Sequence, residues 1–465
     1  MDNQQKNKAL FETVPVPEAI GQMIVPAIFS QIIVLIYNLA DTFYIGRTNS
    51  PEMVAAASLV LPVFNTLIAI AAIAGFGGSS VVSRLLGVSR RDEARRVFSF
   101  GTRVSAAITV LFSLVMLAFS EPILLLLGAK AGKTLAYAQD YTLWVIILGG
   151  VPTVLSNVLS NFVRSVGESG KAGAGITLGG IVNIVLDPLF MFILLPRGNE
   201  IIGAGVATCI SNCISCVYFL VVLRKLGKDS VLHLCPIRQL PEKSSIRSTF
   251  AVGLPSAVSM FLFDLDFIVI DRLMSGYSTV ALAAVGIVLK AERLPLNIGV
   301  GICQGMVPII AYNFASGDHK RMRSLSRYAL MVGIICALIS IALYEAFAPF
   351  IMRLFIRNGA TVSLGTRFLR ARCVATVLMF MSFYHANLFN AYGRGKESMF
   401  LGVMRWAVFN IPMLFLFNRL FGMYGIVWAQ CAGDVLTVLL SLWLHARFWH
   451  KEGRNIPLAI EPRAW

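Results

Sequence analysis

Long apolar runs separated by short polar segments dominate the sequence, and they limit the possible fold more than any other feature. A helix needs about 20 mostly apolar residues to cross a bilayer, and only helices or closed barrels satisfy their backbone there. We therefore predict an all-α polytopic membrane protein with twelve transmembrane helices. Read against Pro, Gly and charge clusters, the runs place these spans at 18–45, 53–85, 93–119, 136–164, 171–195, 202–223, 247–273, 281–314, 321–348, 362–390, 397–419 and 422–448.

Composition and charge support a membrane location. Hydrophobic residues make up 57% of the chain and charged residues 14%, well below the quarter typical of soluble domains. The net charge of +16 comes from basic residues that punctuate the apolar runs, so we expect the lipid bilayer as partner and no nucleic acid. The segment Met1 to Val14 is polar and shows no cleavable signal peptide. We predict a multi-pass protein of the plasma (inner) membrane.

The basic residues also predict an orientation. If both termini are cytoplasmic, 27 Lys and Arg fall on the inner side and 11 on the outer side, with Lys290 and Arg293 inside a span. Inner loops are enriched in Lys and Arg, so this bias favours cytoplasmic termini. Five arginines between Arg353 and Arg372 are an exception on the outer side.

The two halves of the chain resemble each other. Pro26 and Pro255 are 229 residues apart, Gly78 and Gly305 are 227 apart, and Asn161 and Asn387 are 226 apart. Near-constant offsets indicate two six-helix bundles related by pseudo-two-fold symmetry, with a cavity between them. The expected division is a cytoplasmic N-terminal tail (1–17), an N-lobe (18–223), a cytoplasmic linker (224–246), a C-lobe (247–449) and a cytoplasmic C-terminal tail (450–465).

Two carboxylates in the N-lobe predict a cation-coupling site. Asp41 ends the first apolar run, and Asp187 lies one helical turn after Asn183. At about 1.5 Å per residue both acids lie in the outer half of the membrane, where Thr208 could add a hydroxyl. Carboxylates inside a membrane are costly and usually functional. The alternative is that Asp41 caps a helix and that Asp187 only precedes the proline turn at Pro188.

A second group of charged residues lies in the C-lobe. We expect a buried charged network there, either facing the cavity or purely structural, whereas Asp434 and Glu345 are expected to be isolated. The predicted members are Asp264, Asp266, Asp271, Lys290, Glu292 and Arg293.

Other side chains complete the predicted transport machinery. Pro26 lies inside the first span, where a proline weakens the helix and permits bending, so we predict a hinge there. Cys209, Cys213 and Cys216 share a helical face, which favours helix packing over a metal site. The polar side chains expected in the substrate cavity are Gln31, Tyr37, Asn38, Asn157 and Asn161.

Five motifs carry a resemblance to a known family, and they are Pro26 with Asp41, Asn183 to Pro188, Lys290 to Gly299, Gln304 to Pro308 and Ala311 to Asn313. The chain is similar, end to end, to multidrug and toxic compound extrusion (MATE) transporters of the DinF-like and MepA-like branch. The resemblance implies two lobes that export organic cations and lipophilic drugs in exchange for H⁺ or Na⁺. It also implies that Asp41, Asn183, Asp187 and Thr208 match the N-lobe cation site of the family.

The function predicted from these observations is cation-coupled multidrug efflux. A flippase for a lipid-linked sugar or another lipid is the alternative, although its pyrophosphate would favour a cationic cavity. We predict no enzymatic activity, because the sequence has no P-loop and no His-Glu-x-x-His motif. His385 lies deep in an expected span, and we expect it to have a packing role rather than a catalytic one. We further predict a monomer that binds small-molecule organic cations or drugs, needs no cofactor except H⁺ or Na⁺ as coupling ion, and has no metal site beyond one for Na⁺.

Overall fold

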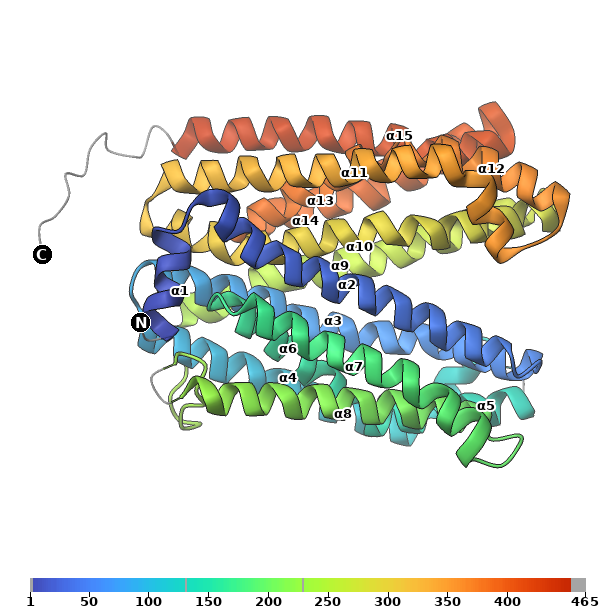
Figure 1. Ribbon diagram of the computed structural model, residues 1–465, viewed down its shortest axis with the longest axis horizontal. Coiled ribbons are helices and arrows are strands. Elements are labelled where there is room, and N and C mark those ends of the chain that lie inside the picture. Colours follow the sequence, from blue (N-terminus) through green and yellow to red (C-terminus); the bar gives the residue numbers. More distant parts are fainter. Residues whose placement is uncertain (1–2, 130–131, 228–229, 453–465) are drawn as a thin grey trace, which may run out of the picture.

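The protein is a bundle of long helices that lie side by side (Figure 1). The computed structural model describes residues 3–129, 132–227 and 230–452, and no strand occurs among them. The N-lobe contains α2 (Val16–Gly46), α3 (Pro51–Gly87), α4 (Arg91–Leu126), α5 (Lys133–Thr142), η1 (Leu143–Leu148), α6 (Gly150–Ser165), α7 (Ser169–Leu189), η2 (Phe190–Leu194) and α8 (Glu200–Leu226). The C-lobe contains α9 (Lys243–Ser275), α10 (Thr279–Ser316), α11 (His319–Phe355), α12 (Gly359–Cys373), α13 (Thr376–Ala391), α14 (Gly395–Val403), η3 (Met404–Asn410) and α15 (Ile411–Glu452).

These helices provide twelve crossings. Within the described residues, nine helices are long and apolar enough to span a membrane, and the bent pair 133–148 and 150–165 makes a tenth. Helices α12 and α13 together form another crossing. The apolar stretch Gly395–His450 has 56 residues, about 84 Å as one helix and far more than a bilayer of about 30 Å. It therefore forms two crossings, and the predicted all-α, twelve-helix fold is confirmed.

Gly422 divides this last stretch. Its backbone has φ 63° and ψ −146°, a region that only glycine adopts without strain. The chain reverses there, at the end of the molecule opposite the first helix, α1 (Asn3–Glu12). The predicted boundary between spans 397–419 and 422–448 was therefore placed correctly to within a few residues.

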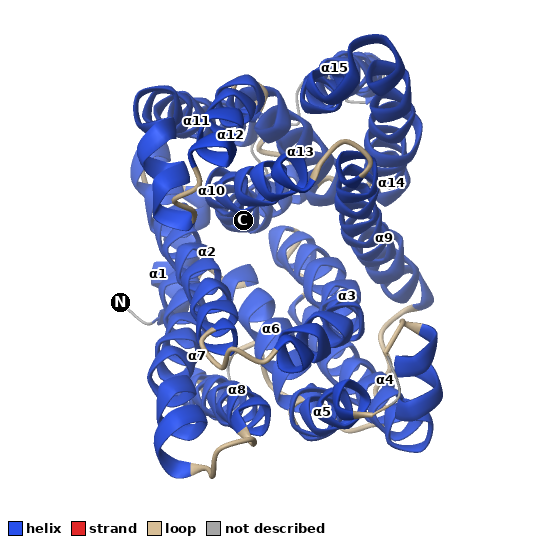
Figure 2. Cartoon of the chain, turned by 90° about the vertical axis from the view of Figure 1, so that its right-hand side faces the viewer, coloured by secondary structure: helices blue, strands red, loops and turns tan. Residues whose placement is uncertain are grey.

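Four helices, α2 and α3 of the N-lobe and α9 and α10 of the C-lobe, form most of the contact between the lobes. Figure 2 shows the N-lobe and the C-lobe end-on, with α2 and α9 at the sides where they join. Helix α2 packs against α7 of its own lobe and α10 of the other, and α3 packs against α6 of its own lobe and against both α9 and α10 of the other. Movement of one lobe relative to the other therefore changes the contacts that α2 and α3 make with α9 and α10.

Close backbone contact seals the α3–α9 seam. A Cβ atom on Gly253 would lie 1.9 Å from the Ile73 carbonyl oxygen, and one on Gly77 would lie 2.1 Å from the Thr249 oxygen. Ser80 Oγ donates a hydrogen bond of 2.7 Å to the Asn390 carbonyl oxygen, again across the lobes. These contacts lie in the half of the molecule toward α1.

Near the middle of the bundle, polar side chains join the lobes. Gln31 Nε2 donates to Gln304 Oε1 over 3.0 Å at the α2–α10 seam. Asn65 Nδ2 donates to Asp264 Oδ2 over 2.7 Å at the α3–α9 seam. The two lobes are thus held together by close backbone packing and the Ser80 hydrogen bond toward one end, and by hydrogen bonds between side chains closer to the centre.

The segment expected as a polar N-terminal tail contains a helix, α1 (Asn3–Glu12). It lies at the same end of the molecule as the last turns of α15, so the described chain starts and finishes on one side (Figure 1). Residues 453–465 of the expected C-terminal tail lie outside the described residues, as do Lys130 and Lys228.

Candidate functional site

The N-lobe site is built on α2 and α7, which approach each other closely. A Cβ atom on Gly180 of α7 would lie 2.7 Å from Ile33 Cγ2 and 3.3 Å from the Tyr37 ring of α2. The missing side chain therefore allows the two helices to touch about one turn before Asp41 and two turns before Asp187. This contact sets Asp41 and Asp187 at the same depth in the lobe.

Hydrogen bonds hold Asp187 in place. Asn183 Nδ2 donates to Asp187 Oδ1 over 3.2 Å and approaches Thr208 Oγ1 of α8 at 3.4 Å. Asp187 is fully buried. One amide thus links a carboxylate and a hydroxyl from two helices, which brings three of the four predicted coupling residues together.

Asp41 completes the group from α2. Asp41 lies one turn after Tyr37, whose ring packs against Gly180 of α7. Asp41 Oδ1 and Asp187 Oδ2 are both buried, and neither has a hydrogen-bond partner among the described residues. Buried polar atoms nearly always have a partner, so these two oxygens are suited to receive one.

Tyr141 of α5 also belongs to this group, and the sequence did not reveal it. Its side chain is buried, and a Cβ atom on Gly205 of α8, three residues before Thr208, would lie 3.4 Å from its ring. A tyrosine near the end of an apolar run is common at membrane interfaces, so its position alone carried no signal. Together these side chains offer carboxylate, amide and hydroxyl oxygens, the ligand types that suit a proton or a hard cation.

The C-lobe contains buried ion pairs, but their members differ from the prediction. Glu292 of α10 accepts two hydrogen bonds from Arg372 of α12, at 2.6 and 2.9 Å, and Arg372 also bonds Gln430. Arg405 Nε donates to Asp434 Oδ1 over 2.9 Å. The prediction that Asp434 is isolated is wrong, and so is that for Glu345, which pairs with Arg370.

Only two predicted network members, Asp266 and Glu292, belong to this cluster. Asp266 is buried and accepts a hydrogen bond of 2.8 Å from Asn410. Asp271, Lys290 and Arg293 are exposed, and Arg293 lies over the Phe267 ring. The prediction of one six-residue network is therefore wrong, since Asp264 instead meets Asn65 of the N-lobe. Helical spacing showed which residues share a face, whereas burial depends on neighbours from α12 and α15.

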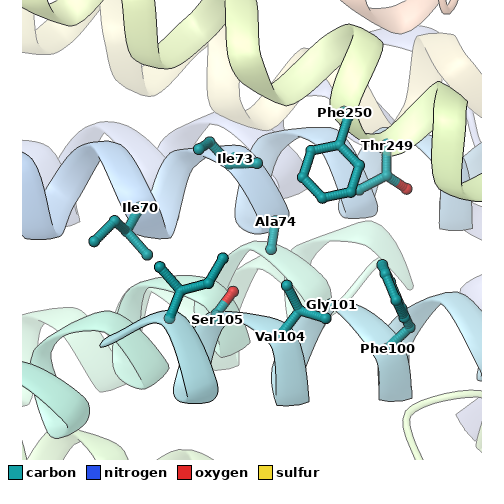
Figure 3. A pocket seen from close by; sticks show the side chains of 10 residues that line it. Ile70, Ile73, Ala74, Phe100, Gly101, Val104, Ser105, Thr249 and Phe250 are labelled. Atoms are coloured by element: carbon teal, nitrogen blue, oxygen red, sulfur yellow. The ribbon is translucent and has the colours of Figure 1, made fainter. Parts of the chain in front are cut away.

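Two of the small hollows among the described residues lie beside the C-lobe ion pairs and beside the α3–α9 seam. One, of about 290 Å³, lies beside the C-lobe ion pairs and is lined by Phe263, Phe267, Trp406 and Arg372, among others. The other, of about 280 Å³, lies between α3, α4 and α9 (Figure 3). Figure 3 shows apolar side chains around it, including Ile70, Ile73 and Phe250, with Ser105 and Thr249 as polar exceptions.

The five predicted cavity residues do not line these hollows. Gln31 bonds Gln304, and Asn38 is exposed and donates to the Val34 carbonyl of its own helix. Asn157 and Asn161 likewise donate to carbonyls one turn earlier. Tyr37 faces Gly180 and the acidic group. Their role as cavity residues stays a prediction.

Pro26 lies within an uninterrupted α2, and its carbonyl oxygen faces α7. A Cβ atom on Gly173 would lie 2.6 Å from that oxygen. The proline therefore sits where α2 is packed tightly against its own lobe, and its hinge role stays a prediction.

A protein-family model decides the family of the chain. The MatE model matches residues 26–189 and again 255–416. The chain belongs to the MatE family. The two matches begin at Pro26 and Pro255 and fall in the two lobes, which agrees with the internal repeat inferred from the sequence.

Individual relatives of this MATE transporter agree. The multidrug export protein MepA of Staphylococcus aureus is 28% identical over 432 residues, 93% of this chain and 94% of MepA. A solved MATE transporter described as outward-facing has a TM-score of 0.90 at 23% identity, over 96% of this chain and 99% of its own.

A transporter from Pyrococcus furiosus has a TM-score of 0.87 at 23% identity, over 95% of this chain and 98% of its own. Its structure is described as having a binding pocket of reverse polarity that suggests a different function. The likeness to this structure shows a shared fold.

Proposed function

We propose that this protein is a cation-coupled antiporter that exports organic cations and lipophilic drugs by alternating access of its two lobes. The observation that carries the proposal is the pair of buried, unpartnered carboxylate oxygens of Asp41 and Asp187. Two carboxylates that share a low-dielectric site cannot both stay ionised at low cost. Either one of them takes up a proton or the pair binds a cation. The site therefore gains or loses positive charge during transport.

Cation binding would change the packing of α2. A proton or Na⁺ shared by Asp41 and Asp187 draws α2 toward α7, and its loss leaves two like charges that push the helices apart. Helix α2 also forms one seam with the other lobe through Gln31 and Gln304. A shift of α2 against α7 therefore alters a contact between the lobes, which links cation binding to lobe movement.

Drug export is supported by the relative MepA, which is named a multidrug export protein. The polarity of the binding pocket differs among proteins of this fold, so the substrate class has to be tested directly. Dye and drug efflux from sensitive cells expressing the protein is the direct assay. We expect efflux by the parent, strong loss in Asp41→Asn and Asp187→Asn, and parental efflux in Asp271→Asn.

Asp271→Asn is a matched control because it removes an exposed carboxylate from α9 outside both charged groups. Unchanged efflux in both N-lobe variants would contradict coupling through Asp41 and Asp187. Absence of efflux by a well-expressed parent would instead favour the lipid flippase. Replacement of Na⁺ by choline at fixed pH in proteoliposomes then distinguishes Na⁺ coupling from H⁺ coupling.

A further inference from the structure

Helix α1 lies across the end of the bundle where the two lobes are sealed. Its residues Leu10 and Phe11 are buried, at 5% and 3% exposure, in an apolar cluster with α2, α10, α11 and α13. An isolated helix of ten residues is marginal in water, so these contacts rather than its own sequence keep α1 folded. The position of α1 therefore depends on how the two lobes pack around it.

Arg321 of the C-lobe binds the end of α1. Its Nε donates to the Phe11 carbonyl oxygen over 2.7 Å, and its Nη2 donates to the oxygens of Leu10 and Val14 over 3.2 and 2.6 Å. The last carbonyls of a helix lack partners within the helix, and a cation there is favourable. One side chain on α11 thus caps α1 and holds the turn that leads into α2.

Further contacts join α1 to the C-lobe. The rings of Phe11 and Tyr312 stack with centroids 4.8 Å apart, and Tyr312 Oη donates to Glu12 over 2.7 Å. Asn313 Nδ2, which is buried, donates to the Phe11 carbonyl oxygen over 3.1 Å. The last turns of α10 therefore contact both the backbone and the side chains of α1.

The same helix also touches the N-lobe. Asn7 Nδ2 donates to Glu168 Oε1 over 3.1 Å. A Cβ atom on Gly167 would lie 3.2 Å from the Phe11 ring and 3.4 Å from Leu10. Because α1 is also joined to α2 by a short turn, it is tied to the N-lobe by the chain and to the C-lobe by Arg321, Tyr312 and Asn313.

We propose that α1 is a latch that holds the lobes closed at this end, which the charge bias predicts to be cytoplasmic. If the lobes separate there, α1 cannot keep both sets of contacts, so opening requires release of the Arg321 clamp. This inference rests on the proposed alternating access. Release of the latch is then a step that each transport cycle must include.

A distance measurement across this end tests the latch. Spin labels are placed on the exposed positions Lys225→Cys at the end of α8 and Lys396→Cys at the start of α14, in lipid nanodiscs. The partly exposed Cys213, Cys336 and Cys431 are first replaced by serine. Electron double resonance then reports how the closed and open populations respond to drug, pH and Na⁺.

Two variants release the latch in different ways. Arg321→Gln removes the clamp from α11, and Phe11→Ala removes the buried ring from α1. Each variant loses contacts that exist only in the closed state, so we expect the ratio of open to closed populations to rise at least about fivefold. Arg327→Gln is the control, since it removes the same charge from an exposed position on the same helix. Parent-like thermal unfolding of the Phe11→Ala variant confirms that the bundle itself is intact.

The outcomes separate the latch from the transport cycle. Longer distances in Arg321→Gln and Phe11→Ala, with parental distances in Arg327→Gln, support the latch. Parental distances in both variants, when the parent itself opens with drug or ions, overturn the latch but leave alternating access standing. A parent that never changes its distances under any condition overturns the proposed cycle, and the latch with it.

Discussion

Arg372 and Glu292 form a two-point ion pair inside the C-lobe, with side-chain exposures of 2% and 14%. The pair joins α10 to α12, and Arg372 reaches α15 through Gln430. A planar guanidinium that meets both carboxylate oxygens fixes orientation as well as charge. Three helices of the lobe are therefore held in register by a single arginine.

Removal of the Glu292 charge is predicted to destabilise the C-lobe. Glu292→Gln keeps the side-chain shape but leaves Arg372 buried without its counter-ion, at a cost of about 3–5 kcal/mol. The melting temperature of the detergent-solubilised protein measures this loss. Asp271→Asn serves as control and should melt with the parent. Equal melting of Glu292→Gln and the parent would show that Arg372 is compensated elsewhere.

Addition of a methyl group at Gly253 is predicted to open the α3–α9 seam. A Cβ atom would lie 1.9 Å from the Ile73 carbonyl oxygen, which belongs to rigid backbone. Gly253→Ala should therefore lower the melting temperature and lengthen distances between labels on the two lobes.

Gly286→Ala is the matched control for the seam, since nothing lies within 4 Å of its added Cβ. It should be neutral or stabilising, by up to about 1 kcal/mol, because alanine favours a helix over glycine. A seam that accepts alanine at Gly253 without any change in distance would contradict the close packing.

The reversal at Gly422 is predicted to require glycine. Its φ of 63° with ψ of −146° strains any L side chain, so Gly422→Ala should cost about 1–3 kcal/mol. Thermal unfolding again provides the measure, with Gly46→Ala as control, because an added Cβ at Gly46 meets nothing within 4 Å. Similar melting of the two variants would argue for a continuous helix at this point.

The sequence predicted the parts of this protein that depend on local pattern. The lengths of the apolar runs predicted the helices. The presence of carboxylates inside apolar runs identified Asp41 and Asp187 as candidate site residues. The C-lobe ion pairs were missed because they join residues 80 and 29 positions apart, for which no spacing rule exists. Arg372 also lies in a basic stretch that resembles a loop. Helix α1 was missed because its contacts with Arg321 and Tyr312, rather than its composition, keep it folded.

The central claim is that Asp41 and Asp187 together bind the cation that drives export. Purified protein in proteoliposomes with a trapped pH or Na⁺ indicator measures cation movement that is driven by an imposed drug gradient. The account predicts drug-driven movement of one of the two cations in the parent and in Asp271→Asn, and its loss in Asp41→Asn and in Asp187→Asn. Full drug-driven cation movement in either N-lobe variant would contradict it.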